Sequence, residues 1–180
     1  MTAPVRVVLV DHSSEAGGAE LALVRLLRTQ QDWQTSLIVP PASDAAGDAF
    51  GVDLGDAEVI RRGPQHRTRK TGRGGALSDA ALAWRIVRSA IGLVMTPAAR
   101  RADVIVANTT RASVYVALAC SVLRKTFAVH IRDLIEPASI GGAATALMRK
   151  LVLPRATAII ANSRASLATV APYVRPTCLQ

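Results

Sequence analysis

Residues 5–20 read VRVVLVDHSSEAGGAE, and this stretch decides the fold. Its first six residues form an apolar run with a single arginine, which is typical of a parallel strand buried on both faces. A turn with two adjacent glycines follows, and leucine and valine then recur at helical spacing from Ala19 to Arg28. A strand, a glycine loop and a helix in this order predict the opening unit of an α/β domain.

The same alternation of strands and helices continues along the chain. We expect further strands at residues 35–39, 57–60, 103–107, 126–131 and 156–161, and helices at residues 77–94, 112–123, 143–152 and 163–170. Such alternation predicts a parallel sheet with right-handed crossovers. The chain has 180 residues, half of them hydrophobic, which is enough for one core. We therefore predict a single Rossmann-like, doubly wound parallel sheet over residues 1–180.

The composition narrows the choice of partners and compartment. The net charge of +9 favours anionic partners, although Arg-rich proteins without a charged partner have the same balance. Aromatic residues make up only 3% of the chain and no recognition motif occurs, so nucleic acid is the weakest candidate. Cys120 and Cys178 are too few for a disulfide framework, and the apolar run at the N-terminus is too short for a signal peptide. We expect a cytoplasmic protein.

The segment from Arg61 to Gly75 is the most basic part of the chain. Its basic residues are Arg61, Arg62, Arg67, Arg69, Lys70 and Arg73, and no acid lies among them. Glycine and threonine separate these residues, which predicts a flexible loop. The loop is either simply solvated or meets an anionic surface at the inner face of a membrane.

Polar residues gather directly after four of the predicted strands. They are Asp11, His12 and Ser13; Asn108, Thr109 and Thr110; His130, Arg132 and Asp133; and Asn162, Ser163 and Arg164. Parallel strands bring their carboxyl ends to one edge of a sheet, and the ligand crevice of open α/β sheets lies at that edge. The alternative is that these residues only form turns and helix caps, for which Ser and Asn are preferred.

The first glycine loop excludes two common nucleotide sites. Gly17 and Gly18 are adjacent and no third glycine follows, so the dinucleotide fingerprint G-x-G-x-x-G is absent from this loop. No Gly-Lys-Ser/Thr triplet occurs either, which disfavours a P-loop kinase. The two glycines either let backbone amides approach an anion at the helix N-terminus or form a plain turn.

Four segments together resemble the N-terminal domain of family 4 retaining glycosyltransferases, which have the two-domain GT-B architecture. The segments are VRVVLVDHSSEAGGAE at 5–20, ADVIVANT at 102–109, VHIRD at 129–133 and AIIANSRA at 158–165. Their order and spacing agree with that family over nearly the whole chain. The resemblance implies hexosyl transfer from a nucleotide-sugar to an acceptor, with the nucleotide-sugar as substrate and no separate cofactor.

The resemblance also implies roles for individual residues. Gly17 and Gly18 match the loop whose amides lie near the donor diphosphate or the acceptor. His130 matches the histidine that faces the transferred sugar, and we predict it as the catalytic residue. The predicted binding residues are Gly17, Gly18, Asn108, Arg132, Asp133, Asn162, Ser163 and Arg164. Arg132 is suited to a phosphate, or it pairs with Asp133. No metal site is expected, because the three histidines lack ligand spacing.

The second domain of that family supplies a Glu-x7-Glu motif and the basic residues that hold the nucleotide. Residues 164–180 contain no acidic residue at all. We therefore expect that this chain lacks the C-terminal donor-binding domain, is inactive alone, and relies on a separate domain or partner chain. The alternative is a non-catalytic module, derived from such a half, that binds a partner or a membrane.

Overall fold

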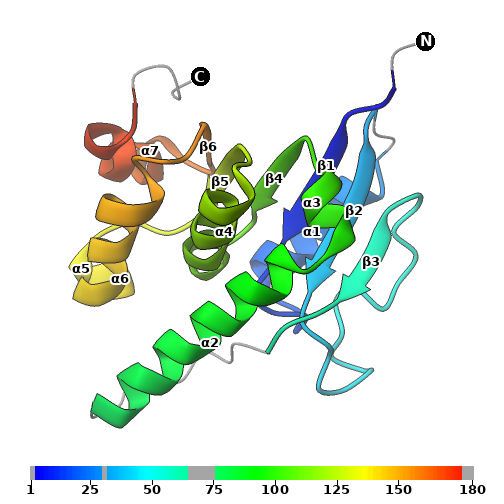
Figure 1. Ribbon diagram of the computed structural model, residues 1–180, viewed down its shortest axis with the longest axis horizontal. Coiled ribbons are helices and arrows are strands. Elements are labelled where there is room, and N and C mark those ends of the chain that lie inside the picture. The colour runs from blue at the N-terminus through cyan, green and yellow to red at the C-terminus, as the bar shows by residue number, and fades with distance from the viewer. Residues whose placement is uncertain (1–2, 30–31, 65–75, 176–180) are drawn as a thin grey trace.

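Six parallel strands form one sheet through the middle of the domain (Figure 1). The computed structural model describes residues 3–29, 32–64 and 76–175, and the side chains of residues 80–175 in the last range. The strands lie side by side in the order β3 (Glu58–Arg61), β2 (Gln34–Val39), β1 (Arg6–Val10), β4 (Val104–Ala107), β5 (Phe127–Ile131) and β6 (Ala158–Ala161). This is the predicted Rossmann-like, doubly wound sheet, and all six predicted strands are confirmed to within two residues.

The order of the strands reverses between β1 and β4. The chain runs outward from β1 to β3, returns to the centre, and runs outward again from β4 to β6. The two central strands are aligned so that Val7 lies beside Val104 and Val10 beside Ala107. The carboxyl ends of β1 and β4 therefore meet at the topological switch point, where open α/β sheets bind ligands.

Helices cover both faces of the sheet. One face carries α1 (Gly18–Leu27), and the other carries α2 (Ala76–Val94), α4 (Thr110–Leu123) and the turns α5 (Pro137–Ile140), α6 (Gly142–Leu147) and η1 (Met148–Val152). The short α3 (Pro97–Arg101) leads into β4, and α7 (Arg164–Val170) and η2 (Ala171–Tyr173) follow β6. Among the described residues, none of these helices is both long and apolar enough to span a bilayer.

The apolar strands are buried from both sides, as their continuous hydrophobic runs predict. Leu9 and Leu37 point to the α1 side, where they pack with Phe50. Val8 and Ile105 point to the other side, into the larger cluster beneath α2 and α4. Cys120 belongs to that cluster, as predicted, and burial raises the pKa of its thiol to about 12.

Three local features differ from the predictions. The helix expected at 143–152 is present, but its second half differs in type, because α6 ends at Leu147 and one π-helical turn, η1, continues directly from it. The helices α3 and α5 were not predicted, and each has a proline in its first turn, where the missing N–H costs nothing. Gly141, with φ of 85°, separates α5 from α6. The predicted basic loop falls largely on residues 65–75, which lie outside the described residues.

The contrast between two isoleucines tests the burial pattern. Ile105 in β4 is fully buried, whereas Ile160 in β6 is 48% exposed. We expect Ile105→Ala to lower the free energy of unfolding by about 2–5 kcal/mol, since a buried cavity replaces the side chain. Ile160→Ala makes the same chemical change and should cost about 1 kcal/mol or less. Urea denaturation measures both; equal losses would contradict the assignment of the core.

Candidate functional site

A chain of hydrogen bonds joins the carboxyl ends of four strands. It begins at Asp11 after β1, passes through Asn108 after β4 and Arg132 after β5, and reaches Asn162 after β6. Neighbouring residues in this chain come from neighbouring strands. The strand ends whose polar residues we grouped from the sequence are therefore brought together at one edge of the sheet, and we call this chain the carboxyl-edge row.

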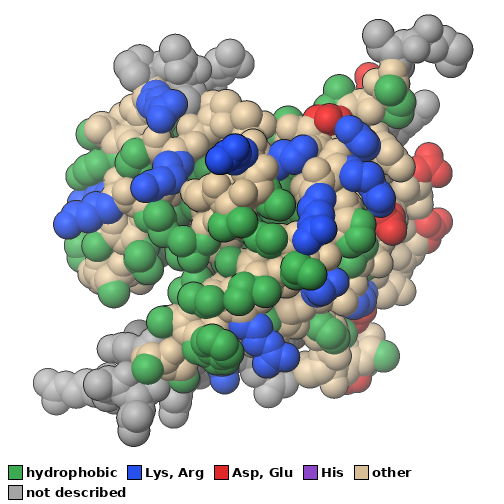
Figure 2. Space-filling model, in the orientation of Figure 1, with side chains coloured by type: hydrophobic (Ala, Val, Ile, Leu, Met, Phe, Trp, Pro, Cys, Tyr) green, Lys and Arg blue, Asp and Glu red, His purple; other side chains and the backbone are tan. Residues whose placement is uncertain are grey.

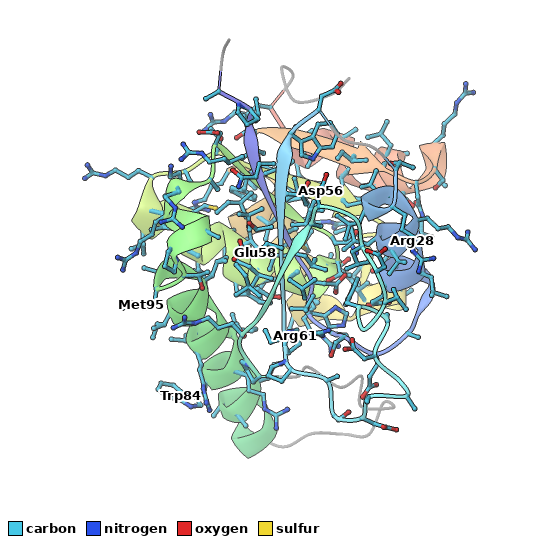
Figure 3. All side chains as sticks on the ribbon, turned by 90° about the vertical axis from the view of Figure 1, so that its right-hand side faces the viewer. Arg28, Asp56, Glu58, Arg61, Trp84 and Met95 are labelled. Carbon is cyan, nitrogen blue, oxygen red and sulfur yellow. The ribbon has the colours of Figure 1, made fainter. Side chains whose placement is uncertain are left out.

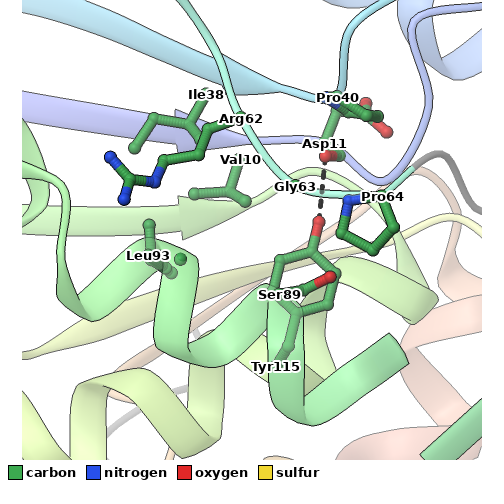
Figure 4. A pocket seen from close by; sticks show the side chains of 11 residues that line it. Val10, Asp11, Ile38, Pro40, Arg62, Gly63, Pro64, Ser89, Leu93 and Tyr115 are labelled. Carbon is green, nitrogen blue, oxygen red and sulfur yellow. Dashed lines mark hydrogen bonds between the residues drawn. The ribbon is translucent and has the colours of Figure 1, made fainter. Parts of the chain in front are cut away.

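Asp11 lies at the switch point and is 1% exposed. Its Oδ2 accepts a hydrogen bond from Asn108 Nδ2 at 2.6 Å, and its Oδ1 accepts one from the backbone N–H of His12 at 2.6 Å. Its backbone carbonyl accepts a hydrogen bond from the hydroxyl of Tyr115, at 2.9 Å, which reaches over from α4 (Figure 4). A buried carboxylate needs such partners, because an unpaired charge inside a protein costs several kcal/mol.

Asn108 connects Asp11 to Arg132. While its amide donates to Asp11, its Oδ1 accepts from Arg132 Nη2 at 2.8 Å and its backbone carbonyl accepts from Arg132 Nε at 3.1 Å. Asn108 is 2% exposed and Arg132 is only partly buried. Two N–H groups of the guanidinium, on Nε and Nη2, therefore bond to the buried Asn108, and this fixes the orientation of the whole guanidinium.

The row ends at the turn before α7. Asn162 Nδ2 donates to the backbone carbonyl of Arg132 at 3.2 Å, and Asn162 Oδ1 accepts from Ser166 Oγ at 3.0 Å. Ser163 caps α7, since its hydroxyl oxygen accepts from the backbone N–H of Ser166 at 3.1 Å. This cap is the structural role that the sequence alternative assigned to Ser163. Arg164 follows the cap and is exposed.

His130 stands in β5, two residues before Arg132. The strand register aligns Ala107 with Val129 and His130 with Ile160, so His130 is the next residue across from Asn108. The ring is half-buried. Burial, with a smaller contribution from the positive charge of Arg132, lowers the pKa of His130 to about 4. The imidazole is therefore neutral at neutral pH and presents one donor and one acceptor.

The glycine loop closes the row on the side of α1. Gly17 is the N-cap of α1, and a Cβ atom there would lie 2.6 Å from Glu20 Oε2, so a larger residue would displace this carboxylate. A Cβ on Gly18 would meet nothing within 4 Å, so packing does not explain the second glycine. Asn108 Nδ2 also lies 3.4 Å from the backbone carbonyl of Ala19, which ties the start of α1 to the row.

Glu20 was not predicted as a site residue. It is 5% exposed, and burial together with the negative charge of Asp11 raises its pKa. Oxygen and nitrogen atoms of Asp11, His12 and Glu20 lie within 4.8 Å of one another, a spacing that a metal ion would accept. However, Asp11 is already hydrogen-bonded through both oxygens, and His12 Nδ1 lies 2.9 Å from Thr109 Oγ1. Asp11 and His12 therefore already have hydrogen-bond partners within the protein.

Arg132 and Asp133 do not form the pair that the sequence left open. Arg132 bonds to Asn108, and Asp133 Oδ2 accepts from Thr110 Oγ1 at 2.7 Å. Within the described ranges, no ion pair joins the two. Asp133 thereby fixes the end of β5 to the start of α4, and Arg132 stays directed toward the row.

Two cavities of the domain lie near opposite edges of the sheet. A cavity of about 20 Å³, the size of one water molecule, lies behind Asp11 and is closed by Arg62, Ser89 and Tyr115 (Figure 4). A cavity of about 630 Å³ lies at the opposite, amino edge of the sheet beside Trp33. Asp11 of the row lines the smaller of these two, whereas His130 and Arg132 line neither.

Solved structures share this fold. The Anabaena protein HepE in complex with UDP is 21% identical, with a TM-score of 0.63, and the match covers 98% of this chain and 43% of HepE. A UDP-N-acetylglucosamine 2-epimerase is 13% identical, with a TM-score of 0.63, over 99% of this chain and 46% of its own. The lipopolysaccharide outer core galactosyltransferase WaaB, in its apo form, is 11% identical, with a TM-score of 0.58, over 97% and 44%.

These matches define the class of fold. The chain is a single α/β domain with the Rossmann-like fold of one half of GT-B enzymes, and it spans less than half the length of these three proteins. No protein-family model and no curated protein sequence matches the chain.

Removing the amide of Asn108 tests the carboxyl-edge row. Asn108→Ala leaves Asp11 and Arg132 without a shared partner, and we expect the free energy of unfolding to fall by about 2–4 kcal/mol. Asn162→Ala, at the exposed end of the row, is the matched control and should cost about 1 kcal/mol or less. Urea denaturation at neutral pH gives both values. If the two variants lost the same small amount, the row would not hold the edge together.

The lowered pKa of His130 predicts an acid-sensitive contribution to stability. The unfolded chain takes up this proton near pH 6.5, but the folded chain does so only near pH 4. Stability that depends on a neutral His130 is therefore present above pH 6.5 and is lost as the pH falls toward 4. We expect the wild type to lose more unfolding free energy across this interval than His130→Gln, which cannot titrate. Parallel curves for the two proteins would show that the imidazole is not desolvated.

Proposed function

We propose that the chain is the acceptor-side half of a GT-B glycosyltransferase of the retaining, family 4 type. In this proposal it helps to transfer a hexosyl group from a nucleotide-sugar to an acceptor. The carboxyl-edge row at the switch point is the observation that carries the proposal, because a sheet of this topology binds its ligand there. The shared fold of WaaB, a galactosyltransferase, and of HepE, which binds UDP, supports it.

The start of α1 and Arg132 together suit the anionic part of a donor. A helix N-terminus offers unpaired N–H groups and a partial positive charge, and Gly18 leaves it unobstructed. Arg132 has five N–H donors, and the two that Asn108 engages leave others free for phosphate oxygens. We assign Gly17, Gly18 and Arg132 to the diphosphate side of the site.

His130 suits the sugar itself. A neutral imidazole can donate to one hydroxyl oxygen and accept from another hydroxyl, and it adds no positive charge beside the donor. The low pKa of His130 keeps the ring in this state throughout the neutral range. We assign His130 to the transferred sugar, and Asn162, Ser163 and Arg164 at the far end of the row to the acceptor.

The donor nucleotide needs a second half. The chain spans 43% of HepE and 44% of WaaB, so we propose that a further domain or a partner chain completes the cleft above the row. The second candidate function is a non-catalytic module that docks on a partner or a membrane. It is favoured by the apolar side chains of α2 that are exposed among the described residues.

A transfer assay tests the proposal. The chain is combined with the donor-binding half encoded with or beside it, and radiolabelled UDP-sugars are offered in turn together with a crude acceptor extract. We expect transfer by the combination and none by the chain alone. His130→Ala should lower the rate about a hundredfold or more, since a positioned polar group at the reacting sugar is lost. Ile160 lies opposite His130 on β6, and Ile160→Ala should leave the rate nearly unchanged.

Two results would go against the proposal in different ways. If the combination transferred no sugar from any UDP-sugar or other nucleotide-sugar, the enzymatic function would fail and the docking module would be the better account. If transfer occurred but His130→Ala matched the wild type, the function would stand and the role of His130 would be wrong.

A further inference from the structure

The outer side of α2 carries an exposed apolar row. Its members are Trp84, Val87 and Ile91 of α2 and Met95, which directly follows the last residue of the helix. Trp84 is 64% exposed and Ile91 is 55% exposed. Figure 3 shows Trp84 and Met95 on the side of the helix that points away from the sheet. The outward side of a helix on a globular domain is normally polar, so this row indicates a surface that another molecule covers.

Arginines flank the apolar row. Arg85 and Arg88 are exposed on the same helix. At the far end Arg100 donates from Nε to the backbone carbonyl of Val94 at 2.8 Å, and its Nη2 lies 3.4 Å from Met95 Sδ. Arg101 follows, and residues 80–101 contain no acid. In Figure 2 hydrophobic and basic side chains lie together over α2, while the acidic side chains of this view gather mostly at its right-hand edge.

The apolar row extends past the edge that carries the candidate site. Strand β3 ends at the carboxyl edge and α2 runs back toward the start of β4, so the first half of α2 lies at the carboxyl edge (Figure 1). Ser89, in the middle of α2, lines the small cavity together with Asp11. Trp84 and Arg85, more than one turn before Ser89, therefore project beyond the strand ends.

We propose that this face of α2 docks on an anionic phospholipid surface. The apolar row enters the boundary between headgroups and acyl chains, and the flanking arginines meet lipid phosphates. Trp84 suits that boundary because its ring is apolar and its indole N–H is polar. A second copy docked through the same row would bring two sets of arginines together, whereas a negatively charged surface complements them. Docked in this way, the domain presents its carboxyl edge close to the lipid headgroups.

Co-sedimentation with vesicles tests this surface and needs no sugar transfer, so its outcome is separate from that of the proposed function. The whole chain is mixed with vesicles of phosphatidylcholine alone or of equal parts phosphatidylcholine and phosphatidylglycerol. We expect binding to the anionic vesicles that weakens as salt is added. Arg85→Gln with Arg88→Gln should weaken binding about thirtyfold, because each basic residue near an anionic membrane contributes about fivefold. Arg25→Gln with Lys150→Gln removes the same charge elsewhere and should have little effect.

A second pair of variants tests the apolar part. Trp84→Ser should abolish detectable binding, whereas Val122→Ser, at an exposed apolar residue of α4, should not change it. Circular dichroism confirms that each variant is folded, and both sites are exposed, so folding should be preserved. Equal binding to neutral and anionic vesicles, or no loss in any α2 variant, would overturn the proposal. Self-association through Trp84 without vesicle binding, seen by sedimentation velocity, would overturn it in favour of a second copy.

Discussion

The hydrogen bond between Asp11 and Asn108 is the constraint on which the edge of this sheet depends. It crosses the switch point and joins the two strands from which the sheet grows in opposite directions. The same amide accepts from Arg132, so a single side chain connects a buried carboxylate to a guanidinium that stays partly accessible. A buried polar chain of this kind is stable only when every member is satisfied, which fixes each of these side chains in one arrangement.

Much of this architecture could be predicted from the sequence, because the strands are buried on both faces and therefore read as continuous apolar runs. The gathering of polar residues at one edge followed from the same pattern. The contacts within that edge could not be predicted: Tyr115 belongs to α4, which packs on β4 and β5, yet it reaches Asp11 after β1, and the two residues are 104 positions apart. The π-helical turn of η1 has no signal in local composition. Glu20, three residues after the N-cap, carried a recognisable signal, since an acid at that position commonly turns back to the helix start.

The two adjacent glycines at the start of α1, Gly17 and Gly18, have different surroundings. The Glu20 carboxylate lies where a side chain on Gly17 would begin, so a larger residue at Gly17 would displace it. Gly18 has no such neighbour, and on the outward face of α2 the apolar side chains of Trp84 and Ile91 are more than half exposed. Features that folding does not require are the ones that carry the functional argument: an unobstructed helix start at the site, and an apolar and basic face beside it.

The central claim is that ligand meets this domain at the carboxyl-edge row. Backbone amide chemical shifts, followed by NMR while UDP-glucose is added to the ¹⁵N-labelled chain, test it most directly, even if binding to one half is weak. The account predicts that the largest shifts occur at Gly17, Gly18, His130 and Arg132, with Asn108→Ala reducing them. Shifts confined to the 630 Å³ cavity at the opposite edge, reported by the indole of Trp33 and the amide of Gly55, would contradict it.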